Sequence, residues 1–182
     1  MIEVEIKIPL TNRNELEEML ESSKFVKVRR IRETDTYFNS DYYNLRKMDQ
    51  ALRVRYCENL LTGEAETLIT YKGPKMDEVS MTRKELETEV GDAAVCIYMI
   101  QALGFYIISN VDKIRQYYHR NPITLCLDQV DGLGDFLELE ILAENESDKE
   151  QALDQLYDIL SELGLKKEDT IQTSYLAMLC NK

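Results

Sequence analysis

The chain has 182 residues, of which 44% are hydrophobic and 31% charged, and its formal net charge is −12. This length suits one domain, residues 1–182, with a substantial core, and the composition is typical of a soluble globular protein. The acidic balance argues against nucleic acid as a partner, because such binding rests on an excess of Lys and Arg facing phosphate. A small polyanionic ligand is compatible with it, since only the local placement of basic residues matters there.

No apolar run approaches the roughly 18 residues of a membrane-spanning helix, so we expect no membrane partner. The four cysteines, Cys57, Cys96, Cys126 and Cys180, lack the spacing of a metal site, and we expect a reduced, cytoplasmic protein. The single histidine, His119, excludes a histidine-rich metal site.

The chain begins with a strand, and a helix follows it at the capping pair Asn12 and Glu15. A second helix starts at Asp92 and ends at Gly104, as helices with a side-chain cap and a terminal glycine do. We predict strands over 1–8, 25–31, 33–38, 51–57, 66–72, 80–90, 105–110, 112–119, 123–130 and 135–142, and helices over 12–23, 93–103, 148–163 and 168–180.

With closely adjacent segments counted together, we expect eight or nine strands in consecutive hairpins, which indicates an α+β fold with a mostly antiparallel sheet. Closing such a sheet into a barrel removes its exposed edges.

Charged and aliphatic side chains alternate strictly along the first strand, where Glu3, Glu5 and Lys7 are separated by Val4 and Ile6. Successive side chains of a strand point to opposite faces, so one face is charged and the other apolar. The same alternation recurs along the chain, at Arg53 and Arg55, at Arg83, Glu85 and Glu87, at Lys113 and Arg115, and at Glu138 and Glu140.

A charged strand face is usually a solvated surface, but the predicted helices need apolar surface, which the aliphatic faces can supply. The charged faces would then point into the barrel. Burying charges of one sign alone would be prohibitive. The candidates balance at seven of each sign, Glu3, Glu5, Glu85, Glu87, Asp128, Glu138 and Glu140 against Lys7, Arg53, Arg55, Lys72, Arg83, Lys113 and Arg115.

An ordered set of motifs over essentially the whole chain resembles the motifs of the CYTH superfamily. The residues within these motifs are most similar to those of the class IV adenylyl cyclase branch. The Glu3-Val4-Glu5-Ile6-Lys7 segment matches the ExExK signature of that superfamily. The further motifs are Asp35-Thr36-Tyr37-Phe38, Ala51-Leu52-Arg53-Val54-Arg55, Thr70-Tyr71-Lys72-Gly73-Pro74, Arg83-Lys84-Glu85, Lys113-Ile114-Arg115, the segment 127–140 and Ser174-Tyr175.

The resemblance implies an eight-stranded antiparallel closed barrel, with helices packed outside, that holds a nucleoside or other organic triphosphate with Mg²⁺ or Mn²⁺. It implies metal binding by Glu3, Glu5, Asp128, Glu138 and Glu140, with Glu85 and Glu87 as supporting acids. It implies phosphate binding by Lys7, Arg53, Arg55, Lys72, Arg83, Lys113 and Arg115. Gln172 departs from the pattern, since relatives often carry a basic residue there, and the departure removes one potential phosphate contact.

Several of these residues have a structural alternative. Arg83 and its neighbours Glu85 and Glu87 could form a self-contained ion network, and Asp128 could fix the turn that follows it. Tyr37 could be a core tyrosine with a hydrogen-bonded hydroxyl, and Tyr175 could serve packing or lid closure.

The resemblance favours an adenylyl cyclase that converts ATP to cyclic AMP and pyrophosphate. The main alternative keeps the site but has water attack the terminal phosphate, a triphosphatase in which Lys72 and Tyr37 act on that water. Lys72 would need a lowered pKa for that role. A second alternative is a module that binds a polyphosphate without turnover. The expected small-molecule partner is ATP, and a homodimer is compatible with the sequence.

Overall fold

The computed structural model describes residues 2–76 and 82–181. Eight strands and seven helical segments follow one another in this described part of the chain. They are β1 (Ile2–Leu10), α1 (Arg13–Ser22), β2 (Val26–Asn39), η1 (Arg46–Met48), β3 (Ala51–Asn59), β4 (Ala65–Lys75), β5 (Arg83–Glu89), α2 (Ala93–Ala102), β6 (Tyr106–Arg120), β7 (Ile123–Val130), β8 (Gly134–Ala143), η2 (Glu146–Asp148), α3 (Lys149–Glu162), η3 (Lys167–Asp169) and α4 (Tyr175–Cys180).

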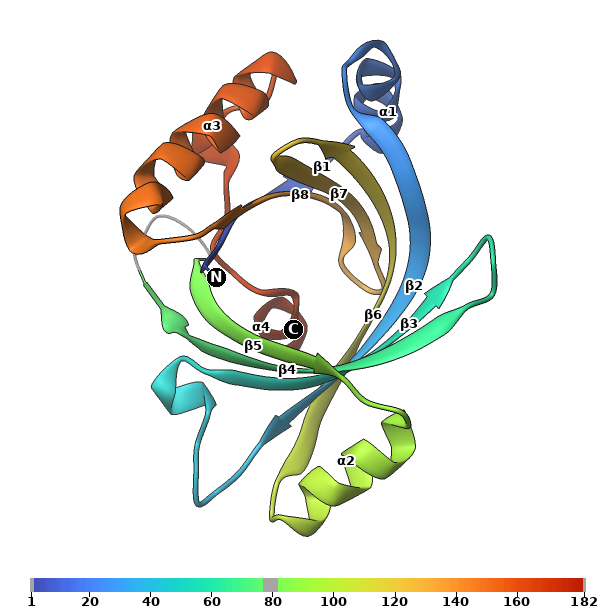
Figure 1. Cartoon of the computed structure of the whole chain (residues 1–182), viewed down its shortest axis with the longest axis vertical. Helices are drawn as coiled ribbons and strands as arrows, with labels where there is room; N and C mark the ends of the chain where they lie inside the picture. The colour runs from blue at the N-terminus through green and yellow to red at the C-terminus, as the bar shows by residue number, and fades with distance from the viewer. Residues whose placement is uncertain (1, 77–81, 182) are drawn as a thin grey trace.

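The strands close into a barrel in the order β1-β5-β4-β3-β2-β6-β7-β8, and every neighbouring pair is antiparallel. In Figure 1 they form a ring with α1, α2 and α3 on its outside. Closure pairs β1 with both β8 and β5, so the first and last strands of the sequence lie side by side. The predicted fold, an eight-stranded antiparallel barrel with outer helices, is confirmed.

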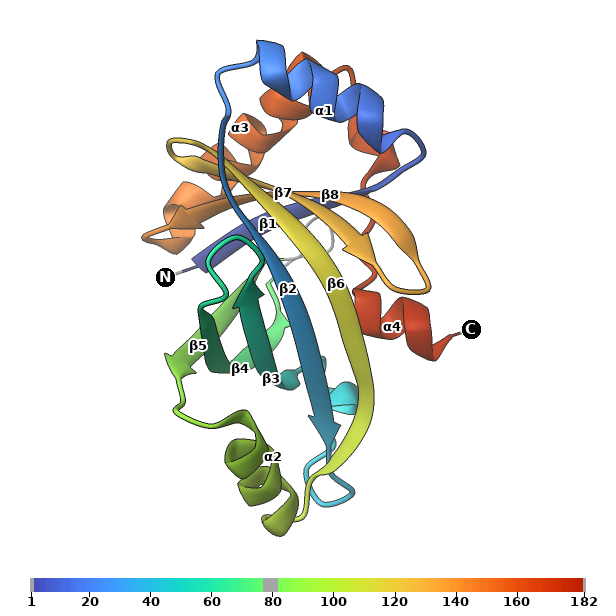
Figure 2. The ribbon, with the colours of Figure 1, turned by 90° about the vertical axis from the view of Figure 1, so that its right-hand side faces the viewer.

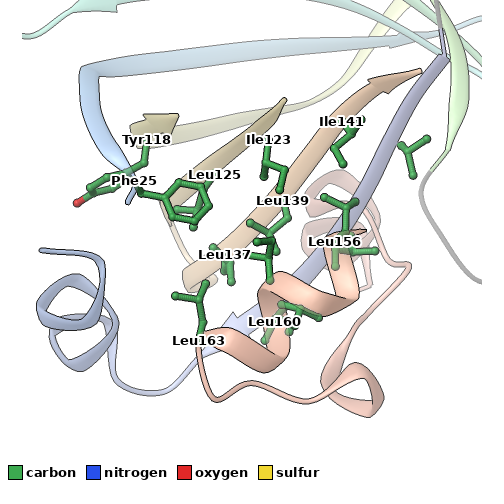
Figure 3. Packing of buried hydrophobic residues seen from close by; sticks show 14 of the residues in the cluster. Phe25, Tyr118, Ile123, Leu125, Leu137, Leu139, Ile141, Leu156, Leu160 and Leu163 are labelled. Atoms are coloured by element: carbon green, nitrogen blue, oxygen red, sulfur yellow. The ribbon is translucent and has the colours of Figure 1, made fainter. Parts of the chain in front are cut away.

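The main hydrophobic core lies on the outer side of β1, β7 and β8, under α1 and α3. Figure 3 shows Leu156 and Leu160 of α3 packed onto the aliphatic faces of these strands. Val4 and Leu139 from those faces are completely buried. Burying one such leucine stabilises the fold by about 2 kcal/mol. The helices therefore take up the aliphatic faces, and the charged faces point into the barrel as predicted.

A smaller core joins α2 to the other side of the wall, where Ile100 packs against Phe38 and Val54. The Asp92 side chain caps this helix by accepting a hydrogen bond from the backbone N–H of Val95, at 2.9 Å. None of the described helices is long and apolar enough to cross a membrane.

Two strand breaks predicted from the sequence are wrong. The segments 25–31 and 33–38 form one strand, β2, and the segments 105–110 and 112–119 form one strand, β6. Figure 2 shows β2 and β6 as a long, bent pair. Arg32 and Val111, which the predictions left between strands, lie within the paired ladder, which bends through two register shifts.

The predicted C-terminal helix over 168–180 is also wrong in its first part. A short 3₁₀ turn, η3, is followed by extended chain, and the Ile171 N–H donates to the Lys7 carbonyl of β1 at 2.8 Å. The helix α4 begins only after Ser174, whose hydroxyl accepts from the Ala177 N–H. The beginning of the predicted strand over 80–90 lies outside the described residues, and its described part is β5.

Candidate functional site

The charged faces of the strands surround a cavity of about 570 Å³. All predicted site residues line it except Asp128, which is completely buried and contacts the lining residues Lys113, Arg115 and Tyr175. The helix α4, seen within the ring in Figure 1, contributes further lining residues, among them Tyr175 and Leu176. The barrel thus brings together side chains from seven strands and from the C-terminal helix.

Three carboxylates form a cluster on one wall of the cavity. Oxygen atoms of Glu3, Glu5 and Glu140 all lie within 4.8 Å of one another, because Glu5 pairs directly with Glu140 across β1 and β8. Burial and the nearby charge of Glu138 raise the pKa of Glu5 to about 7. Burial and the charge of Glu3 raise the pKa of Glu140 well above its usual range.

This cluster fits a divalent cation. Hard cations such as Mg²⁺ and Mn²⁺ prefer carboxylate oxygens as ligands. The raised pKa values show that the negative charges of Glu5 and Glu140 are poorly compensated by the protein, and a bound cation would compensate them.

Glu138 and Asp128 lie against basic residues. Glu138 accepts from Lys7 at 3.0 Å and contacts Arg115. Burial alone would raise the pKa of Glu138, but the Lys7 and Arg115 charges hold it well below its usual range. Asp128 accepts two hydrogen bonds from Arg115, both 2.6 Å long, and one from Lys113 at 3.0 Å. In this arrangement both acids orient basic side chains. Metal binding by either acid remains a prediction.

A second pair of acids, Glu33 and Asp35, contacts another set of basic side chains. Arg55 donates to both Asp35 oxygens, at 2.6 and 2.8 Å, and its guanidinium lies 3.1 Å from Glu33. Lys113 is also 3.1 Å from Glu33. Although burial opposes ionisation of Glu33, the charges of Arg55 and Lys113 lower its pKa. The sequence analysis gave neither acid a role, although the alternation of Glu33, Asp35 and Tyr37 signals an inward face.

The β5 residues contact different partners. Lys72 donates to Glu85, Arg53 lies 3.4 Å from Glu87, and Arg83 donates to Asp49 of the loop before β3 at 2.9 Å. Glu85 and Glu87 therefore pair with cations of β3 and β4 rather than with Arg83.

Lys72 keeps its proton in this environment. Burial would lower its pKa, but the charges of Glu3, Glu85 and Glu5 raise it above the ordinary lysine value. A charged Lys72 suits phosphate binding and does not suit a base that accepts a proton from water.

Two tyrosines form part of the wall. The hydroxyl of Tyr175 donates to Asp128 at 3.0 Å, and the ammonium of Lys7 lies 4.0 Å from the centre of its ring. Tyr37 is half-buried, packs in the same small cluster and lines the cavity. Its hydroxyl makes no hydrogen bond with the residues that the structure describes, so the alternative of a hydrogen-bonded core tyrosine is not met.

The interior is more acidic than the sequence analysis expected. Glu33 and Asp35 add two carboxylates to a predicted set that was balanced at seven of each sign. Within the described part of the chain, each of the seven predicted cations already contacts at least one carboxylate. A triphosphate entering this cavity must therefore compete with carboxylates, unless metal cations enter with it.

The fold and the site together define a closed antiparallel barrel whose interior is lined by acids and bases. The chain belongs to the CYTH domain family, whose match covers residues 1–175.

Two relatives carry adenylate cyclase names. The chain is 35% identical over 98% of both lengths to a protein of Methanocaldococcus jannaschii named as a candidate adenylate cyclase. It is 27% identical to adenylate cyclase CyaB of Aeromonas hydrophila, over 79% of this chain and 70% of that protein.

Solved structures agree with the fold. A protein from Pyrococcus horikoshii OT3 has a TM-score of 0.90 with 35% identity, over 98% of both chains. The Hippeastrum protein HpAC1, described as an adenylyl cyclase candidate with a dominant triphosphatase activity, has a TM-score of 0.69 at 16% identity. That match covers 99% of this chain and 95% of the other, and it shows similarity of fold.

Proposed function

We propose that this chain is a metal-dependent enzyme that converts ATP to cyclic AMP and pyrophosphate. The observation that carries the proposal is the three-carboxylate cluster of Glu3, Glu5 and Glu140 beside a row of cations in one cavity. The adenylate cyclase names of two relatives support the choice of reaction.

The acidic cluster would hold Mg²⁺ or Mn²⁺, with Glu138 as a neighbouring acid. When bound there, the cation would neutralise phosphate charge and make the ribose 3′-hydroxyl more acidic. The cluster carries its charges close together, which is costly for the protein alone although Lys7 lies 3.6 Å from Glu5 and Arg115 lies 3.5 Å from Glu140.

The basic side chains would bind the triphosphate and then the departing pyrophosphate. Arg55 and Arg115 each present a planar fork that suits phosphate oxygens, and carboxylates hold both forks in position. Because Asp35 and Asp128 fix these guanidinium groups before the ligand arrives, little ordering cost remains on binding.

In the reaction the ribose 3′-hydroxyl would lose its proton to solvent, and its oxygen would form a bond to the α-phosphorus while the bond from that phosphorus to the pyrophosphate oxygen breaks. The protein contributes by aligning the two oxygens and stabilising the leaving charge. Lys7, Lys72 and Lys113 are buried or largely buried, and their pKa values are raised, so they are charged when the pyrophosphate leaves.

Hydrolysis of the terminal phosphate is the second candidate, favoured by the triphosphatase activity described for the Hippeastrum relative of this fold. The charged state of Lys72 counts against the version in which this residue activates water.

Product analysis tests the proposal. Purified protein would be incubated with ATP, GTP, thiamine triphosphate or inorganic tripolyphosphate and Mg²⁺ or Mn²⁺. Cyclic AMP with pyrophosphate supports the cyclase, orthophosphate supports the triphosphatase, and no product supports a binding module. The analogue 3′-deoxy-ATP sharpens the comparison, since it keeps the triphosphate but lacks the attacking oxygen. Release of orthophosphate from it at the ATP rate would overturn the cyclase assignment.

A further inference from the structure

One end of the cavity differs from its charged centre. Leu45 is buried there, and Ile108, Leu176 and Ala177 are half-buried, all of them lining the same cavity. These residues come from the loop between β2 and β3, from the start of β6 and from α4. Ile108 lies beside the end of β2, and the loop that carries Leu45 follows that end. We call this set, together with Gln50, the apolar mouth.

A β-bulge places Ile108 in the mouth. Tyr37 pairs with Ser109 and Phe38 pairs with Ile107, so Ile108 has no partner on β2. The charged residues that face the interior from β6 are odd-numbered, and without the bulge Ile108 would point outward. Bulges of this kind redirect a side chain and are frequent beside active sites.

Gln50 adds an amide beside these apolar residues, and the charged residues Arg46 and Asp49 of the same loop also line the cavity. Gln50 itself lines the cavity, and its side-chain oxygen is buried without a hydrogen-bond partner in the part of the chain that the structure describes. A buried amide oxygen without a donor costs about 1 to 3 kcal/mol. The amide offers an acceptor and two donors at one place, the combination needed to bind the edge of a nucleobase.

The loop that carries Leu45 and Gln50 is held in place. The Gln50 N–H donates to the Leu45 carbonyl at 2.9 Å. The neighbouring Asp49 adopts a left-handed backbone, φ 52°, and its carboxylate accepts from Arg83 at 2.9 Å and from the Lys75 N–H at 2.8 Å. Because Arg83 also belongs to the predicted phosphate-binding set, the loop and the charged centre are linked directly.

We propose that the apolar mouth is the nucleoside subsite of the cavity and that the Gln50 amide binds the edge of an adenine base. The inference rests on the proposed function, because it assumes that the triphosphate occupies the charged centre. Inorganic tripolyphosphate has no apolar surface to bury, whereas a purine ring would cover Ile108 and Leu176. A cavity of about 570 Å³ lies within the range of pockets that enclose nucleotide-sized ligands.

The base edge accounts for the choice of adenine. At its Hoogsteen edge adenine offers the N6 amino donor beside the N7 acceptor, and a glutamine amide matches both at once. Guanine presents two acceptors, N7 and O6, at its Hoogsteen edge, so a Gln50 amide bound at this edge would find no donor for its oxygen. Gln50 is therefore a specificity-determining residue in this proposal.

Calorimetric titration in the presence of Mg²⁺ tests the nucleoside subsite with three ligands. They are inorganic tripolyphosphate and the α,β-methylene analogues of ATP and GTP, whose bridging carbon blocks cyclisation. Gln50→Leu keeps the side-chain size and removes the amide. We expect about tenfold weaker binding of the ATP analogue, tripolyphosphate affinity within about twofold, and loss of the preference for adenine over guanine. Ile108→Ser, measured in parallel, should weaken both nucleotide analogues and spare tripolyphosphate.

The control is Gln101→Leu, the same substitution on the exposed surface of α2, which should change none of the three affinities. Circular dichroism would confirm that each variant folds. If Gln50→Leu and Ile108→Ser leave nucleotide affinity unchanged, or weaken tripolyphosphate equally, the nucleoside subsite is wrong although the triphosphate site stands. If the wild-type protein binds none of the three ligands, the proposed function fails and this inference fails with it.

Discussion

Replacement of Glu140 by glutamine should change the free energy of unfolding in opposite directions with and without metal. The carboxylate oxygens of Glu140 lie within 4.8 Å of those of Glu3 and Glu5. At an effective dielectric constant near 20, each such repulsion amounts to about 3.5 kcal/mol. The attraction to Arg115, whose guanidinium lies 3.5 Å away, amounts to about 5 kcal/mol on the same scale.

Removing the charge therefore relieves two repulsions and loses one attraction, a net gain of up to about 2 kcal/mol for the metal-free protein. Protonation of one carboxylate in the wild type makes the gain smaller, because burial and Glu3 already raise the pKa of Glu140. With Mn²⁺ at about 100 times its dissociation constant, wild-type protein should gain about 2.7 kcal/mol. A variant that binds Mn²⁺ about 100-fold more weakly would gain only about 0.4 kcal/mol.

Urea denaturation in excess chelator and in excess Mn²⁺ measures both quantities. Glu150→Gln is the matched control, because it makes the same change on the exposed surface of α3. If Glu140→Gln destabilised the metal-free protein and kept the full stabilisation by Mn²⁺, the cluster would not be the metal site.

Three further outcomes are expected. Arg55→Ala should cost about 3 to 5 kcal/mol of unfolding free energy, because it leaves the buried Asp35 carboxylate without its bidentate partner and only 3.6 Å from Arg53; combining it with Asp35→Ala should restore part of the loss in denaturant titrations, and additive losses would contradict the pairing. Tyr175→Phe should keep the ring beneath Lys7 but lose the hydrogen bond to Asp128, and thermal melting should report about 1 kcal/mol of destabilisation; an unchanged melt would mean that this bond contributes nothing. Excess chelator should abolish turnover of ATP and restored Mg²⁺ should recover it, whereas full turnover in chelator would reject a metal-dependent reaction.

Most of what the sequence could predict about the barrel interior came from the alternation of charged and aliphatic side chains along the strands. Where a strand alternates without interruption, as β1 does, the inward face follows from the period of two alone. Glu33 was given no role because a new strand was predicted to begin there; Arg32, left between two predicted strands, lies within the paired ladder of β2. Polar residues on both faces hide such a continuous strand from any hydrophobic pattern.

The apolar mouth could not be predicted in this way. Ile108 faces the cavity because one residue of β6 is unpaired, and a bulge leaves no signature in the alternation of side chains. Gln50 belongs to a connection of irregular backbone, where position depends on tertiary contacts such as that between Asp49 and Arg83. The C-terminal segment was predicted as continuous helix because its pairing with β1 is a contact between residues far apart in sequence.

The closure of the barrel is uneven, and this has a consequence for amide hydrogen exchange. Among the described residues β1 pairs with β8 at nine positions, from Ile2 to Leu10, but with β5 only at Ile2 and Glu3. Amides of β7 and β8, which lie between well-paired neighbours under α3, should exchange only on global unfolding. Those of β5 should exchange through local opening at far lower cost. Because β5 also carries Arg83 and Glu85, a bound ligand should slow amide exchange most on this strand, where the fewest residues pair across the closure of the barrel.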